Sequence, residues 1–363
     1  MKRAQKIFLN IFVSVVAVCI LFACVGCSKN DSKDLSPSVM LAQNDEELQV
    51  PSLTNANATA ETKNLYDYIC TVYKQNIISG QQESTGIAED YEFDYIFEHT
   101  GKYPAIRGLD FINDDFEGVV ERAKKWAHRG GIVTICWHCS SNFDKGFTEC
   151  QADKLTDEQW EQMLTEGTPE YRAMLAGMDK AGNALLELQR EGIPVLWRPF
   201  HEFDGNWFWW GKGENANEHL KAIWKIMYRH FTDDLGLNNL IWVLGYSFGG
   251  GMIPNFYPGD EYCDIIGADS YLVNLYGAEN RLYKKLVRVT DAPKPIVFHE
   301  TGLIPTVEQF KEVPWAYFMT WHTTYLIDEN TVEALNALYN DPYVITLDDL
   351  PAFYSFQEHL ILF

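Results

Sequence analysis

Two glutamates each follow an apolar run of the kind that forms a buried β-strand. Glu202 comes soon after Ile193–Trp197, and Glu300 directly follows Pro295–His299. Two carboxyl groups about 5–5.5 Å apart can divide the acid and nucleophile roles in cleaving a glycosidic bond with retention of configuration. A lone glutamate at a strand end is more often structural. The pairing of the two therefore supports the hypothesis of glycoside hydrolysis.

An aromatic block, Trp207-Phe208-Trp209-Trp210-Gly211, lies shortly after Glu202. Indole rings beside a carboxylate reduce its solvation and raise its pKa, which suits a general acid. Flat rings also offer stacking surfaces to sugars, so we expect Trp207 and Trp210 to bind substrate. The alternative is that these tryptophans belong to the core and that Glu202 forms an ion pair with Arg198.

Eight apolar or aromatic runs alternate with amphipathic stretches, a pattern that predicts parallel strands joined by helical crossovers. Eight strands favour an α/β fold of the (β/α)8 TIM-barrel type, a single catalytic domain with its site at the C-terminal strand ends. A doubly wound open sheet is the rival, but no glycine-rich phosphate loop follows the first strand. The expected strands are Asn76–Ser79, Tyr103–Phe111, Gly131–His138, Ile193–Glu202, Asn239–Gly245, Asp264–Tyr271, Pro295–Glu300 and Trp315–Trp321. The expected helices include Phe116–Arg129, Glu170–Glu191, Glu218–Thr232, Ala278–Val289, Thr306–Lys311 and Val332–Tyr339.

The N-terminus has a basic start and an apolar run over residues 7–23, which is typical of a secretory signal. Leu21-Phe22-Ala23-Cys24 resembles a bacterial lipobox, so residues 1–27 are expected to be a lipoprotein signal peptide with Cys24, or else Cys27, acylated. The run is short for a membrane span of about 20 residues. Residues 28–62 are expected to form a flexible polar linker and 63–363 the catalytic domain. We expect an exported bacterial lipoprotein, at the cell surface or in the periplasm, held to a membrane by its lipid anchor.

Charge and cysteine spacing argue against several other partners. The formal net charge of −22 would repel the phosphates of a nucleic acid. Cys136, Cys139 and Cys150 surround His138 but do not follow the paired spacing of a zinc site. We therefore expect no nucleic acid partner, no bound metal and no cofactor. The sequence leaves open whether one or two disulfides form.

Two segments resemble motifs of glycoside hydrolase family 26, which is best known for β-mannanases. The first is Trp197-Arg198-Pro199-Phe200-His201-Glu202 followed by Gly205-Asn206-Trp207-Phe208-Trp209-Trp210-Gly211, similar to the acid/base motif of the family. The second is Lys294-Pro295-Ile296 leading to Glu300-Thr301-Gly302, similar to its nucleophile motif. Similarity covers most of residues 64 to 350. The departures, Cys136 and Cys139 beside His138 and Phe298-His299 before Glu300, bear on substrate preference.

The resemblance implies a role for each matching residue. Glu202 matches the acid/base and Glu300 the nucleophile, and the hydroxyl of Tyr271 would donate a hydrogen bond to the nucleophile. The other matches, all expected to contact the sugar at the cleavage point, are His138, His201, Trp207 and Trp321. Trp315 could instead hold the place of Trp321 if the strand ran in another register.

The implied activity is that of a retaining endo-β-1,4-mannanase acting on mannan, galactomannan or glucomannan by double displacement. The alternatives are a β-glucanase or β-xylanase of the same family, or a surface glycan-binding lipoprotein without turnover. Binding alone needs the aromatic rings but not two facing carboxylates, which favours an enzyme. The sequence gives no indication of oligomeric state.

Overall fold

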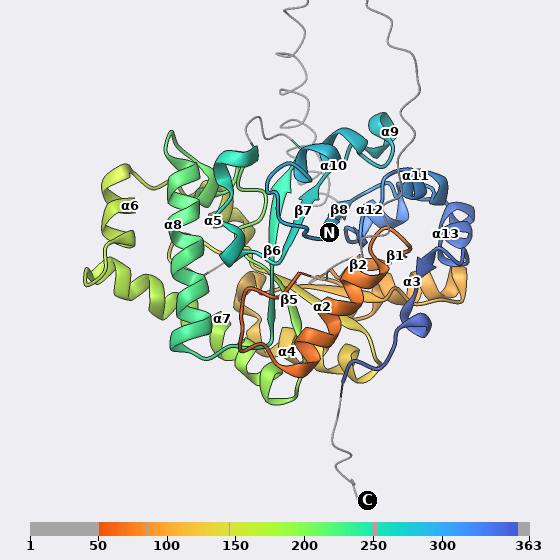
Figure 1. Ribbon diagram of the computed structural model, residues 1–363, viewed down its shortest axis with the longest axis horizontal. Coiled ribbons are helices and arrows are strands. Elements are labelled where there is room, and N and C mark those ends of the chain that lie inside the picture. Colours follow the sequence, from red (N-terminus) through yellow and green to blue (C-terminus); the bar gives the residue numbers. More distant parts are fainter. Residues whose placement is uncertain (1–50, 85, 145, 249–252, 355–363) are drawn as a thin grey trace, which may run out of the picture. The chain divides into compact units, whose positions relative to one another are not determined.

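The eight strands that form the core of the molecule close into a parallel barrel in the order in which they occur in the chain (Figure 1). The computed structural model describes residues 51–354 except 85, 145 and 249–252, so the predicted signal peptide with Cys24 and Cys27 lies outside the described residues. Every position of the barrel strands is buried, which is why their sequences are mostly continuous apolar runs. The barrel strands are β2 (Gly80–Gln82), β3 (Ile106–Asp110), β4 (Ile132–Cys136), β5 (Val195–Arg198), β6 (Leu240–Ser247), β7 (Ile265–Asp269), β8 (Ile296–Thr301) and β9 (Phe318–Thr320).

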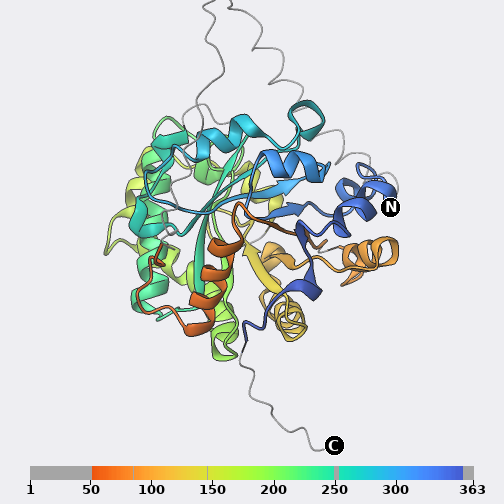
Figure 2. The ribbon, with the colours of Figure 1, turned by 45° about the vertical axis from the view of Figure 1, so that its right-hand side comes forward.

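Helices surround the strands, as Figure 2 shows from a second side, and the predicted (β/α)8 fold is confirmed. The longest, α7, begins after Thr168, whose hydroxyl accepts a hydrogen bond from the amide of Tyr171, and has Pro169 in its first turn. All six expected helices are present within a few residues of their predicted ends. The helices are α2 (Ala60–Val72), α3 (Tyr91–Thr100), α4 (Phe116–His128), α5 (Phe147–Ala152), α6 (Asp157–Leu164), α7 (Pro169–Arg190), α8 (Ala216–Arg229), α9 (Val273–Tyr276), α10 (Asn280–Leu286), α11 (Val307–Glu312), α12 (Thr324–Ile327) and α13 (Val332–Tyr339).

Apolar side chains fill the N-terminal half of the barrel and leave its C-terminal end to polar groups. Leu65 and Ile69 of α2 belong to one buried cluster with Leu196 of β5 and Val297 of β8. Helix α2 therefore packs against the N-terminal ends of the strands. Successive inward positions of a strand are two residues apart, so Arg198 occupies the layer above Leu196.

The first barrel strand is not the predicted one. The apolar run Asn76–Ser79 contributes β1 (Ile77–Ile78), which pairs outside the barrel with β10 (Val344–Ile345), and the barrel is closed by the polar β2. The amide of Gln81 in β2 donates to the carbonyl of Trp321, so hydrogen bonds replace apolar packing there. A Cβ on Gly80 would lie only 2.8 Å from the carbonyl oxygen of Phe318, which explains the glycine.

The folded domain begins earlier than the predicted boundary at residue 63. The amide of Thr54 donates to Asp264 at 2.7 Å, and the side chain of Asn55 donates to the carbonyl of Leu237 at 3.2 Å. Thr59 then caps α2. Polar residues that suggested a solvated linker instead tie residues 54–62 to the barrel.

The described residues contain no disulfide, and five cysteines among them are free thiols: Cys70, Cys136, Cys139, Cys150 and Cys263. Across the same residues, no helix has the length and apolar character that a membrane crossing requires. Packing of the barrel and its helices thus stabilises the described domain without covalent cross-links.

Candidate active site

Three carboxylates meet at the C-terminal end of the barrel. One oxygen each of Glu202, Asp269 and Glu300 lies within 4.8 Å of the other two. They come from the turn after β5, from the end of β7 and from β8. The barrel thus brings together the two glutamates singled out in the sequence and adds an aspartate to them.

Glu300 is aimed by an irregularity in the sheet. Ala268 pairs with Phe298, but the next residue, Asp269, pairs with Glu300 and skips His299. A bulge of this kind re-aims the side chains beyond it. Glu300 is 4% exposed, and its two oxygens accept hydrogen bonds from Nη2 of Arg198 and, at 2.9 Å, from the hydroxyl of Tyr271.

Arg198 is the cation of this site. Its guanidinium is fully buried and also donates from Nη1 to Asp269 at 2.9 Å. Burial opposes its charge, but the carboxylates of Asp269 and Glu300 raise its pKa well above the ordinary value. The alternative of an ion pair between Arg198 and Glu202 is therefore wrong.

Glu202 lies in a left-handed turn. Its φ is 53° and that of Phe200 is 50°, values that side-chain-bearing residues rarely adopt. The turn is fixed to β6 because the amide of Glu202 donates to the carbonyl of Gly245 at 2.7 Å and Asp204 accepts from the amide of Ser247 at 2.7 Å. Backbone strain held by such contacts is frequent at functional sites.

The environment of the Glu202 side chain favours its neutral form. Burial raises its pKa to about 8, and the negative charge of Glu300 adds to that effect. The indole of Trp207 donates to its Oε2 at 2.8 Å and opposes the rise. At neutral pH the group carries a proton that it can donate.

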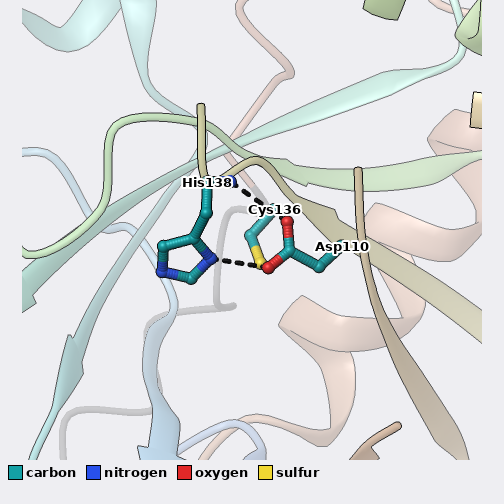
Figure 3. A group of neighbouring side chains, drawn as sticks. All are labelled: Asp110, Cys136 and His138. Atoms are coloured by element: carbon teal, nitrogen blue, oxygen red, sulfur yellow. Dashed lines mark hydrogen bonds and ion pairs between the residues drawn. The ribbon is translucent and has the colours of Figure 1, made fainter. Parts of the chain in front are cut away.

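Two histidines extend the site in a hydrogen-bonded row. Nδ1 of His138 donates to Asp110 at 2.5 Å (Figure 3). Its Nε2 lies 3.1 Å from Nε2 of His201. Burial, and then the charge of Arg198, lowers the pKa of His201 well below its ordinary value. When His138 is neutral, its Nε2 accepts the N–H of His201.

Asp110, Cys136 and His138 are also close enough together to suggest a cation site (Figure 3). However, Oδ1 of Asp110 accepts from the amides of Ile112 and His138, and Oδ2 accepts from the ring of His138. The hydrogen bonds explain the cluster without an ion. The absence of a metal stays a prediction.

The aromatic residues divide into two groups. Trp207 and Trp321 are partly exposed at the C-terminal end of the barrel, where sugar stacking would occur. Trp210 is completely buried, and its indole donates to the carbonyl of His201 at 2.8 Å, so its predicted contact with substrate is wrong. Through this hydrogen bond, Trp210 supports the turn that carries Glu202 from the core side. Trp315 is buried as well, which leaves the position at the strand end to Trp321.

Sequence reasoning assigned no role to Asp269 and did not find the bond from Arg198 to Glu300. Arg198 ends β5 and Asp269 ends β7, and both strands are buried. A charged residue at the end of a buried strand is the signal that could have paired these two. The barrel pairs Arg198 and Asp269 across β5 and β7, strands that are far apart in the sequence.

Comparison with known proteins shows the family to which this chain belongs. A model described as "Glycosyl hydrolase family 26" matches residues 54–349. A mannan endo-1,4-β-mannosidase of Thermothelomyces thermophilus is 33% identical over 88% of this chain. The chain spans 67% of that relative, and 51% and 56% of two from Piromyces sp., so it covers only about half to two thirds of them.

Solved structures give the same result. The crystal structure of a ruminal GH26 endo-β-1,4-mannanase has a TM-score of 0.76 and 32% identity, covering 84% of this chain and 71% of the other. A β-mannanase from a symbiotic protist of the termite Reticulitermes speratus, complexed with gluco-manno-oligosaccharide, has a TM-score of 0.75 and 31% identity over 83% and 98%. With one glutamate in the turn after β5, another near the end of β8 and a family match spanning nearly the whole described domain, the chain belongs to glycosyl hydrolase family 26.

Proposed function

We propose that this protein is a retaining endo-β-1,4-mannanase that uses Glu202 as acid/base and Glu300 as nucleophile. The observation that carries the proposal is the proximity of the two groups, with one oxygen of each inside 4.8 Å. Retaining enzymes hold their carboxyl groups about 5–5.5 Å apart, whereas inverting enzymes leave about 6.5–9.5 Å for a water molecule. The spacing supports direct attack by a carboxylate.

The first step uses the two carboxyl groups in opposite protonation states. Glu202, whose pKa is raised to about 8, protonates the glycosidic oxygen as the bond to the anomeric carbon breaks. Glu300 attacks that carbon from the other face and forms a glycosyl ester. Arg198 and Tyr271, which donate to Glu300, keep its side chain in one orientation for the attack.

The second step follows from the loss of one charge. Once Glu300 is esterified it no longer carries a negative charge, so its contribution to the high pKa of Glu202 disappears. Glu202, now deprotonated, accepts a proton from water as that water attacks the anomeric carbon. The sugar leaves with its original configuration, and both groups return to their starting states.

Other residues at this end of the barrel have roles in holding the sugar. His138 and His201, bonded to each other through their Nε2 atoms, border the sugar as a buried row, and Trp207 and Trp321 offer partly exposed rings. The names of the relatives support a mannan backbone, and one solved neighbour carries a gluco-manno-oligosaccharide. No cofactor takes part in this scheme.

A reducing-sugar assay on galactomannan, glucomannan, xylan and mixed-linkage β-glucan tests the substrate. We expect the fastest release from the mannans, and none from Glu300→Ala. Faster hydrolysis of xylan or mixed-linkage glucan would assign the chain to another backbone while keeping the mechanism. Binding of mannan without release by the wild type would instead favour the glycan-binding alternative.

A separate proposal concerns location and rests on the N-terminal sequence alone. Acylation of Cys24 or Cys27 would tether an exported domain to a membrane. The full chain should then partition with membranes in a bacterial host, and replacing both cysteines by serine should release it. A soluble wild type whose mature N-terminus lies elsewhere would contradict the lipid anchor.

A further inference from the structure

A second aromatic feature lies at the C-terminal end of the barrel, outside the residues already discussed. Phe248 follows β6, Tyr276 ends α9, and their rings stack with centroids 5.3 Å apart and planes 21° from parallel. Tyr276 is 47% exposed and its neighbour Leu275 is 61% exposed. Leu275 and Tyr276 therefore present two large apolar side chains to solvent at adjacent positions of the chain.

The Phe248–Tyr276 stack adjoins the strand ends that carry the carboxylates. Ser247 pairs with Asp269, which pairs with Glu300, so Phe248 lies one residue beyond this row of paired residues. Its amide donates to the carbonyl of Asp269 at 3.0 Å. Helix α9 stands at the end of the barrel toward which the arrows of β6 and β7 point (Figure 1).

The stack also lies on a definite side of the site. The turn that carries Glu202 is bonded to β6 through Gly245 and Ser247, and Phe248 comes next in that strand's path. Glu202 protonates the leaving sugar in the proposed mechanism. A polysaccharide chain that continues past Glu202 on the leaving side therefore runs toward Phe248 and Tyr276.

We propose that Phe248 and Tyr276, with Leu275 beside them, form a subsite that stacks against a mannosyl ring on the leaving-group side, beyond the sugar that Glu202 protonates. This inference rests on the proposed mannanase function and deepens it. A half-exposed tyrosine ring fixed by a second ring presents a flat apolar surface to the C–H face of a pyranose. An uncharged sugar also fits a chain whose net charge is −22.

The test compares Tyr276→Ala with the wild type on two substrates. Mannohexaose can reach the stack, whereas an activated aryl β-mannobioside with a small leaving group cannot. We expect kcat/KM for mannohexaose to fall about tenfold, mainly through KM, and that for the aryl glycoside to stay within about twofold. Tyr276→Trp, which keeps a stacking ring, should restore the value for mannohexaose.

Phe97→Ala is the matched control. Phe97 is 43% exposed and stacks on Tyr103 at 4.4 Å, but that pair belongs to α3 and the segment before β3, away from the catalytic end. Phe97→Ala should leave kcat/KM unchanged for both substrates. The bond at which end-labelled mannohexaose is cut should shift in Tyr276→Ala only, which a general loss of folding would not produce.

Three outcomes would overturn the subsite: an equal loss on both substrates, no loss on mannohexaose, or a dimer in solution that disappears with Tyr276→Ala. Wild-type protein that cuts neither substrate would refute the proposed function, and the subsite with it. Wild-type cleavage with an unaffected Tyr276→Ala variant would refute the subsite alone.

Discussion

Glu202 and Glu300, the two proposed catalytic residues, lie close together at the C-terminal end of the barrel but have contrasting surroundings. Glu300 is held within β8 by a cation and a phenol, and both its oxygens accept hydrogen bonds. Glu202 lies in a strained turn, partly exposed, with one indole N–H as the donor to its side chain among the described contacts. Donors around an ionised group stabilise the charged form, whereas partial burial with few donors favours the neutral form.

The contrast teaches how one barrel can run acid and nucleophile chemistry at the same pH. Both residues are glutamates, so the sequence gives them equal intrinsic chemistry. Their surroundings separate the roles, because Arg198 pairs with one of them and not with the other. The following tests would break or sharpen this difference.

Removing each carboxylate should give different symptoms, and these are the largest effects we expect. Glu300→Ala should lose activity on the order of 10⁴-fold or more on every substrate, because no glycosyl ester can form. Glu202→Ala should still react with an aryl glycoside whose leaving group needs no proton, giving a burst and then slow turnover. Azide should rescue that variant with a β-glycosyl azide, whereas azide with Glu300→Ala should give the α-azide. The reverse stereochemistry would exchange the two roles.

Arg198→Met should remove the feature that distinguishes Glu300. Two buried carboxylates, Asp269 and Glu300, would lose their cation, which costs about 3–5 kcal/mol of stability. Denaturant unfolding measures the loss, and activity should fall as well because Glu300 would lose the guanidinium donor that fixes the orientation of its carboxylate. Lys102→Ala, which breaks an exposed pair with Asp348, should change stability by less than about 1 kcal/mol. Equal effects of the two substitutions would contradict the role of Arg198.

Tyr271→Phe removes one donor to Glu300 and leaves the arginine in place. A hydrogen bond to a charged group contributes about 1.5–3 kcal/mol, so the rate should fall by roughly 10- to 100-fold. Pre-steady-state measurement of the glycosylation step should show the loss there. A normal glycosylation rate would mean that Tyr271 does not orient the nucleophile.

The smallest effect concerns the pH profile. Because the acid must be protonated, kcat/KM should fall as the pH rises through about 8, the raised pKa of Glu202. Trp207→Phe removes the indole N–H that lowers this pKa, so the alkaline fall should move to higher pH. An unchanged or lowered midpoint in this variant would show that the hydrogen bond does not tune the acid. The Phe97→Ala control should keep the wild-type midpoint.

Prediction from sequence succeeded where a strong local pattern sets a strand or helix. The run before Glu300 is apolar and β-branched, and β8 lies there; helix α13 has the predicted ends. It failed at β2, because Gly80-Gln81-Gln82 has no apolar character and is held by its pairing with β9 and by the hydrogen bond from Gln81 to Trp321, which form only when the barrel closes. It failed at Trp210 because an indole in the core and one at a sugar site look alike in a sequence. Exposure separates them, and exposure depends on the turn around Glu202.

The sequence by itself determined the chemistry available to this protein, namely two glutamates at strand ends, an arginine beside one of them and aromatic residues nearby. Those features follow from residue type and from the period of local structure, which neighbours along the chain decide. Only the tertiary structure decided that Arg198 pairs with Glu300 and not with Glu202, which is nearer in the sequence. The closed barrel and the bulge at Asp269 bring the ends of β5 and β8 together, while the left-handed turn carries Glu202 out of the strand. The barrel and the turn both depend on contacts between residues far apart in the sequence, and that is the physical reason.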